Sequence, residues 1–372
     1  MKIRMFIVLV MATLLFEAGC GKQVYIENRR FILTEGLDLE EDNKVVIYTL
    51  NPVFSTGAKD KQKITASTID TIRESRIKLD AKLNGSIAPG KLQNLLISKK
   101  LLQQRQLLPF LDVFFRDPKN EINANVIVVD GAVKDVIHMN PSDKGRLGAI
   151  IKQMVDSTFR SRITVQTSLQ KFHQQLKDTT VTPYLTEMKV KKNDLVISGT
   201  ALLQKDGTYA ASLNNQESSL LLLLQRNTKN RIPITIHLPP EQFHTNERMS
   251  VVSFDITKAK VNIRPKSEAA HLTIDISMKV QIELTERLFA IETEKQSKPL
   301  EQAIEQELKK ECEALIKKAQ KHQIDPFQIG LYVRAYDYKT WKSVQDNWGK
   351  ALSEATVNIS PKVAIKGAGV SE

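Results

Sequence analysis

A strict alternation of apolar and polar residues near position 280 narrows the range of folds open to this chain. Apolar side chains stand at every second position, at Leu272, Ile274, Ile276, Met278, Val280, Ile282 and Leu284. Successive side chains of a strand point to opposite faces, so this spacing predicts one long strand with a buried face and a solvated face. Asp275 and Glu283 fall on the solvated face, which favours surface charges over catalytic carboxylates.

The segments around this strand predict a second half made of long antiparallel strands. Apolar residues at 252–256 and 259–263 stand in opposite registers, which predicts a bulge or turn near Thr257-Lys258. Residues 357–365 alternate again, and Pro361 within them favours a strand at a sheet edge.

Two helices are predicted in the same half by apolar residues at three- and four-residue spacing. Between Leu300 and Ala319 this stripe includes Cys312, which favours a buried thiol over a reactive one. Trp341 and Trp348 share a face of the second helix, which makes them core anchors rather than ligand platforms.

The first half alternates strand-like and helix-like segments, which favours at least partly parallel strand pairing. The expected order is a strand at 45–53, a helix at 67–79, a strand at 92–97, a helix at 99–115 broken near Pro109, a strand at 125–129 and a helix at 142–159.

A hairpin and a buried helix follow. Strands at 195–203 and 208–213 flank Lys205-Asp206-Gly207, whose glycine can supply the positive φ of a hairpin turn. A helix is expected to start at Asn215 and to carry Leu220–Leu224 into the core.

The chain has 372 residues, which is longer than one hydrophobic core usually grows. The predicted fold is therefore multidomain α+β. Residues 1–19 form a signal peptide, and residues 20–187 form an α/β-like N-terminal region that can be divided into two subdomains. Residues 188–368 form a C-terminal α+β domain with long antiparallel strands plus packed helices.

The N-terminus predicts export. Lys2 and Arg4 precede an apolar run from Met5 to Phe16, the arrangement of a secretory signal peptide. A helix of this run is about 18 Å long, well short of the roughly 30 Å hydrocarbon core of a bilayer.

Ala18-Gly19-Cys20 resembles the bacterial lipobox, in which the cysteine thiol receives diacylglycerol before cleavage. Glu17 departs from the apolar residue that lipoboxes prefer at its position. Two acyl chains hold a soluble domain stably at a bilayer, so Cys20 is the predicted lipid attachment site. The alternative is an ordinary signal peptide in which Cys20 is incidental.

The composition gives little support to nucleic-acid binding. The formal net charge is +12, but the basic residues are spread along the chain and only 6% of residues are aromatic, which leaves little for base stacking. A positive charge also suits a position beside anionic lipid. The two cysteines exclude a disulfide framework.

No catalytic, cofactor or metal site is predicted from the motifs. The six histidines never stand at metal-ligand spacing, and no phosphate loop, nucleophile elbow or HExxH helix is present. His237 and His244 bracket Pro239-Pro240 and are more simply surface histidines. Glu40-Glu41-Asp42 lie in a polar turn, although a pair of carboxylates for glycan cleavage could converge from anywhere.

Several short segments, in order along the chain, resemble the Ger(x)C proteins, the lipoprotein subunits of nutrient germinant receptors in bacterial spores. They are Gly36-Leu37-Asp38, Leu108–Leu111, Phe115–Pro118, Asn123–Val129, Gly131-Ala132, Gly199–Leu202, Lys205–Gly207, Leu213–Ser218, Ala319-Gln320, Asp325-Pro326-Phe327, Trp341 and Trp348.

This resemblance implies an α+β protein of about three domains, anchored on the outer face of the cell membrane, which in a spore is the inner membrane. It implies assembly with A and B membrane subunits and no catalysis, so that the chain would serve receptor assembly or signal coupling. Two other classes stay open from the residues alone. One is a solute-binding lipoprotein of a transport system, and the other is a cell-wall hydrolase.

Overall fold

The computed structural model describes residues 29–40, 42–54, 57, 60–82, 86–88, 90–139, 145–243, 246, 248–268, 271–289 and 293–367. Its strands are β1 Arg29–Phe31, β2 Thr34–Leu39, β3 Val45–Pro52, β4 Gln62–Ile69, β5 Ser86–Ala88, β6 Asn94–Ser98, β7 Asn125–Val129, β8 Tyr184–Lys191, β9 Asp194–Leu203, β10 Tyr209–Leu213, β11 Ile232–His237, β12 Val251–Glu268, β13 His271–Arg287 and β14 Thr356–Gly367. Its helices are α2 Ile72–Lys82, α3 Lys99–Gln104, α4 Leu108–Arg116, α5 Val133–Ile137, α6 Leu147–Arg160, α7 Leu169–Lys177, α8 Asn215–Leu224, α9 Thr293–Lys321, α10 Ile329–Tyr336, α11 Tyr338–Val344 and α12 Trp348–Glu354, with short 3-10 turns at Pro240–Phe243 and Gln345–Asn347.

The N-terminal half is organised by an eight-stranded sheet in the order β10-β9-β8-β7-β6-β2-β3-β4. Its four central strands, β2, β6, β7 and β8, run parallel, while β3, β4, β9 and β10 pair antiparallel. The expected partly parallel pairing is therefore confirmed. β1 and β5 form a separate parallel pair.

Helices cover both faces of this sheet. α3, α4 and α7 pack on one face through residues such as Leu101, Leu111 and Phe172. α5 and α6 pack on the other face through residues such as Val136 and Ile151. Because both faces are covered, β6 and β7 are buried along their whole length, which explains their nearly continuous apolar sequences.

The C-terminal half contains a four-stranded sheet in the order β11-β12-β13-β14. β12 and β13 form a long antiparallel ribbon, and the alternating burial of β13 follows the predicted pattern. The predicted irregularity appears as a register shift between Ile256 and Lys258. β14 lies at the sheet edge, as Pro361 indicates, but it runs parallel to β13.

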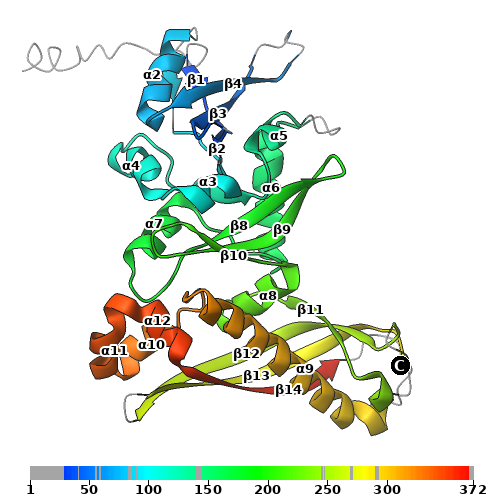
Figure 1. Cartoon of the computed structure of the whole chain (residues 1–372). Coiled ribbons are helices and arrows are strands. Elements are labelled where there is room, and N and C mark those ends of the chain that lie inside the picture. The colour runs from blue at the N-terminus through cyan, green and yellow to red at the C-terminus, as the bar shows by residue number, and fades with distance from the viewer. Residues whose placement is uncertain are drawn as a thin grey trace, which may run out of the picture.

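The long helix α9 lies across this sheet (Figure 1) and also covers the edge of β14. The backbone N–H of Val363 donates to Glu305 Oε1 at 2.8 Å, and that of Ile365 donates to Glu301 Oε1 at 2.8 Å. These carboxylates accept hydrogen bonds from N–H groups of the edge strand that would otherwise be free to pair with another strand.

α8 lies between the two halves, and its position explains the run of leucines from 220 to 224. All five are buried, because the helix contacts β9 and β10 of the first sheet and β11 and β12 of the second. The helix begins as predicted at Asn215, where Asn214 and Glu217 form a reciprocal capping box.

The segment after α9 ties the halves together by hydrogen bonds. The Thr182 N–H donates to the Asp325 carbonyl at 2.9 Å, and Gln204 Nε2 donates to the His322 carbonyl at 3.0 Å. Gln225 Nε2 donates to the Pro326 carbonyl at 2.8 Å. Residues 322–330, called the hub here, thus contact the loops that precede β8 and follow β9, the C-terminal end of α8 and their own half.

Asp325 is the centre of the hub, and its carboxylate is fully buried. Oδ1 accepts the N–H groups of Phe327 and Ile329, both at 3.1 Å, and Oδ2 accepts the Gly330 N–H and Trp348 Nε1, both at 2.8 Å. Burial raises the pKa of Asp325 to about 6, against the opposite effect of these donors. The group is still mostly ionised at pH 7 and can accept all four hydrogen bonds.

Three predicted helices are placed differently. The helix expected at 67–79 begins at Ile72, because residues 67–69 belong to β4 and pair with β3. The break expected near Pro109 in the helix at 99–115 is confirmed, but it divides the segment into two separate helices, and Pro109 sits in the tolerated first turn of the second, α4. The helix expected at 142–159 begins at Leu147, and residues 142–144 lie outside the described residues.

The predicted division after residue 187 falls within β8, and β9 and β10 continue the first sheet beyond it. The division therefore stays a prediction about independent folding units. The mixed α+β architecture itself, with a mixed first sheet and long antiparallel strands in the second half, is confirmed.

Candidate ligand pocket

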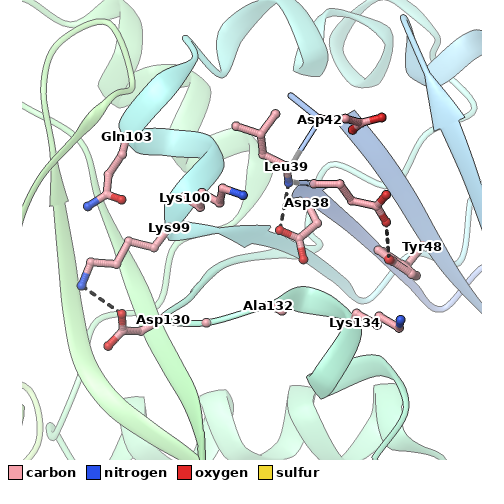
Figure 2. Close-up of a pocket in the computed structure, with 12 residues that line it drawn as sticks. Asp38, Leu39, Asp42, Tyr48, Lys99, Lys100, Gln103, Asp130, Ala132 and Lys134 are labelled. Atoms are coloured by element: carbon pink, nitrogen blue, oxygen red, sulfur yellow. Dashed lines mark hydrogen bonds and ion pairs between the residues drawn. The ribbon is translucent and has the colours of Figure 1, made fainter. Parts of the chain in front are cut away.

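A pocket of about 890 Å³ opens at one edge of the first sheet (Figure 2). The parallel strands β2, β6 and β7 end there, and their following loops and helices supply most of its lining. The carboxyl ends of parallel strands are a frequent ligand-binding position in α/β sheets. The fold thus brings residues near 38, 99 and 131 to one place.

Asp38 fixes the floor of the pocket. The residue is 6% exposed. Oδ1 accepts the Leu39 N–H at 2.9 Å, and Oδ2 accepts the Val133 N–H at 2.7 Å. The carboxylate therefore joins the end of β2 to the start of α5, which makes Asp38 a positioning residue for the pocket wall.

Lys99 forms a second polar group where β6 meets α3. Its ammonium lies 3.0 Å from Asp130 Oδ1, 3.5 Å from Glu187 Oε1 and 4.7 Å from the centre of the Tyr209 ring. Burial alone would lower the pKa of Lys99, but contacts with Asp130 and Tyr209 and the charge of Glu187 outweigh it, so the pKa is raised. Lys99 therefore stays charged.

Tyr48 of β3 lines the far side of the pocket. Its hydroxyl donates to Glu40 Oε1 at 3.2 Å. Burial, with the nearby carboxylate of Glu40, raises the pKa of Tyr48 to about 12. The phenol is protonated at neutral pH and acts as a hydrogen-bond donor rather than a base.

The pocket carries both signs of charge. Its acidic residues are Asp38, Glu40, Asp42 and Asp130, and its basic residues are Lys99, Lys100 and Lys134. Asp38 accepts two backbone N–H groups, and Asp130 pairs with Lys99. Glu40 accepts the Tyr48 hydroxyl, and Asp42 pairs with Lys44. Within the described ranges, no three His, Cys, Asp or Glu side chains gather to hold a metal ion. The arrangement suits reversible binding of a small polar molecule.

The residues singled out from the sequence lie elsewhere. Cys20, the predicted lipid site, is outside the described residues. Cys312 is fully buried on α9, and burial raises the pKa of its thiol, as expected of a core cysteine. Asp275 and Glu283 are half-exposed and pair with Lys266 and Arg231.

Of the remaining residues singled out from the sequence, some lie in the core and some line the pocket. Trp341 and Trp348 are buried core residues, as predicted, but they lie on two helices, α11 and α12, and not on one. Glu40 and Asp42, expected in a polar turn, line the pocket, whereas Glu41 and His244 lie outside the described residues.

Sequence reasoning missed the pocket because its residues are far apart along the chain. Asp38, Lys99 and Asp130 each follow or end a buried apolar strand, and that shared position is the signal that could have found them. Their assembly also needs the order in which β2, β6 and β7 pair, which local patterns do not give.

Comparison with known proteins covers both halves of the chain. Residues 22–190 match the family model described as spore germination protein N-terminal domain. Residues 198–369 match the model described as spore germination B3/GerAC like, C-terminal. Together the two models cover residues 22–369 except for the seven residues 191–197.

Relatives match over nearly their full lengths. Spore germination protein GerQC of Bacillus cereus is 20% identical over 96% of this chain and 97% of its own. Spore germination protein KC of Bacillus subtilis is 21% identical over 98% of this chain and 95% of its own.

The fold is also that of a solved relative. The crystal structure of the GerBC protein superposes with a TM-score of 0.58 over 89% of this chain and 96% of that chain, at 16% identity. The fold, both family models and the full-length relatives agree on one family. The chain belongs to the GerAC-like family of spore germination proteins, the C subunits of germinant receptors.

Proposed function

We propose that this chain is a lipid-anchored, non-enzymatic subunit of a spore nutrient germinant receptor, needed for receptor assembly or signal coupling. The observation that carries the proposal is the end-to-end match to spore germination proteins, in which neither half of the chain is left over. Its partners would be the A and B membrane subunits of the receptor, at the outer face of the inner spore membrane.

A lipid anchor fits the arrangement of the chain. No helix among the described residues is long and apolar enough to cross a bilayer. Cys20 precedes β1 by nine residues, which gives the anchored cysteine a tether of up to about 30 Å.

Replacing Cys20 by alanine should release the protein from the membrane fraction or leave it with an uncleaved signal, because only that thiol can carry the diacylglycerol. The measurement is membrane fractionation together with incorporation of labelled palmitate. Cys312→Ser is the matched control, since it removes the other thiol and should keep both label and membrane association. A Cys20→Ala protein that stays membrane-bound with its signal removed contradicts the anchor.

Deletion of the gene should leave growth and sporulation intact but abolish the response of spores to the nutrients that this receptor reads. The test uses a strain in which it is the only germinant receptor, and germination is followed by loss of refractility. A cationic surfactant, which bypasses receptors, should still germinate the spores. Normal germination with every nutrient after the deletion rules out the receptor role.

The pocket favours a second candidate, a solute-binding lipoprotein, because about 890 Å³ is enough for a small polar molecule. The two candidates differ in what the isolated chain does. Calorimetry against amino acids, sugars and nucleosides should give a saturable heat for a solute binder. A subunit that acts only within its complex should give none.

A further inference from the structure

The C-terminal end of α8 carries an arginine where helices commonly end on glycine. The Arg226 N–H donates to the Leu223 carbonyl and the Asn227 N–H to the Leu222 carbonyl, both at 2.9 Å, the bonding pattern of a Schellman motif. Arg226 has φ 61°, a left-handed conformation that costs a side chain energy and glycine none. Helix termination alone does not explain the arginine.

The Arg226 side chain is bonded to one of two stacked tyrosines at the surface. Nη1 donates to the Tyr332 hydroxyl at 2.7 Å, which leaves the other guanidinium donors without a partner among the described residues. The Tyr332 ring stacks on Tyr336, with centroids 6.5 Å apart and planes 18° apart. Tyr336 is 74% exposed, so the tyrosine pair presents an aromatic surface to solvent.

These residues line a pocket of about 480 Å³ that is positively charged. Arg264 and Lys266 of β12 join Arg226 in its wall, and none of the described residues that line it is acidic. Lys266 is paired with Asp275 at 2.7 Å, which leaves the two guanidinium groups to set the charge of the pocket.

The pocket lies between α10 and a part of β12 that has no partner strand on its outer edge among the described residues. β11 pairs with β12 only as far as Ile256, so residues 257–268 have no partner strand opposite β13 in the described part of the chain. An edge strand can accept an extended peptide, with side-chain pockets nearby providing selectivity. Two like-charged copies would repel each other there, which argues against self-association.

We propose that this pocket, formed by Arg226, Arg264, Lys266, Tyr332 and Tyr336, binds a carboxylate-bearing segment of a protein partner. Guanidinium groups form paired hydrogen bonds with carboxylates, and the stacked tyrosines offer a surface to the apolar parts of the same segment.

A protein occupant is favoured over anionic lipid by position, an argument that rests on the proposed anchor at Cys20. α10 lies at the opposite end of the molecule from β1, where the anchored end of the chain enters the fold (Figure 1). A tether of up to about 30 Å keeps β1 within that distance of the bilayer, and α10 lies at the other end of the fold from β1.

The test places the photo-crosslinking residue p-benzoylphenylalanine at Tyr336 in the full-length, anchored chain produced together with its A and B subunits. Two variants are compared in this background. Arg226→Gly removes the guanidinium at a position where glycine is the preferred helix end. Lys192→Gly is the matched control, because Lys192 is also an exposed cation at positive φ, 48°, in the β8–β9 turn far from the pocket.

Mass spectrometry should map the adduct to a partner segment that contains Asp or Glu. Arg226→Gly should reduce the adduct about tenfold, the loss expected for one charge-assisted hydrogen bond, and Lys192→Gly should leave it unchanged. No adduct, an adduct to lipid alone, or a yield that Arg226→Gly does not change overturns the proposal. Co-isolation of the A and B subunits is scored separately, so that failure of the pocket is distinguished from failure of the receptor assignment.

Discussion

Replacing Asp325 by alanine should lower the free energy of unfolding by about 4 kcal/mol, because four buried N–H groups lose this acceptor at once. The Trp348 indole is one of these donors, so the packing of Trp341 against Trp348, with ring centroids 5.5 Å apart, should loosen as well. Urea unfolding followed by tryptophan fluorescence measures both effects.

Asp325→Asn is the informative companion variant. It keeps the size of the side chain but places an amide NH₂ against two N–H donors, so it should also destabilise the fold, although less than alanine. Asp206→Ala, at an exposed turn outside the hub, should change the unfolding free energy by less than about 0.5 kcal/mol. If Asp325→Ala is as mild as Asp206→Ala, the hub does not stabilise the fold in the way its geometry indicates.

Replacing Ile276 by aspartate should unfold the C-terminal half, whereas Asp275→Ala should be nearly silent. Ile276 is 1% exposed in the core between β13 and α9, and an unpaired carboxylate there costs several kcal/mol, roughly the whole stability of a domain. Asp275 points to the other face, where its contacts with Lys266 and Asn358 are half-exposed and contribute at most about 1 kcal/mol.

Circular dichroism and thermal unfolding of the two variants check this contrast directly. Equal losses would mean that the period-two pattern of β13 does not separate a buried face from a solvated one. Retained stability in Ile276→Asp would mean that this position can reach water.

The sequence predicts best those elements whose burial is complete or strictly alternating. β7 begins and ends at the predicted residues, Asn125 and Val129, because both sheet faces are covered and the whole strand must be apolar. β13 follows its alternation for the opposite reason, since one face is solvated. In both cases the burial of the strand produces a simple pattern of apolar residues in the sequence.

Elements set by distant partners are predicted less well. Residues 67–69 are assigned to a helix by local spacing, but their pairing with β3 makes them strand. The short helix α5 was not predicted, because five residues carry too little periodicity. The β9–β10 hairpin is predicted locally, yet its place in the first sheet depends on pairing with β8.

In the candidate site, too, local motifs are visible in the sequence, but the contacts between distant segments are not. The resemblance of Gly36-Leu37-Asp38 and Gly131-Ala132 to a known family is visible in the sequence, but not that both segments meet at one pocket. Asp325-Pro326-Phe327 is likewise recognisable as a motif. That Asp325 accepts a hydrogen bond from Trp348 cannot be predicted from the motif, because the two residues meet only in the folded chain.

The parallel pairing of β13 with β14 has a consequence for how the protein matures. Thr273 pairs with Thr356, so the whole helical segment between them must cross over before the edge of β13 is closed. Contacts between positions so distant in sequence form slowly. If the chain is exported from its N-terminus, β14 leaves the channel after β13 and the helices that follow it, and until then β13 exposes a long row of unpaired backbone groups outside the cell. This interval is when the protein is most open to aggregation, to proteases and to chaperones.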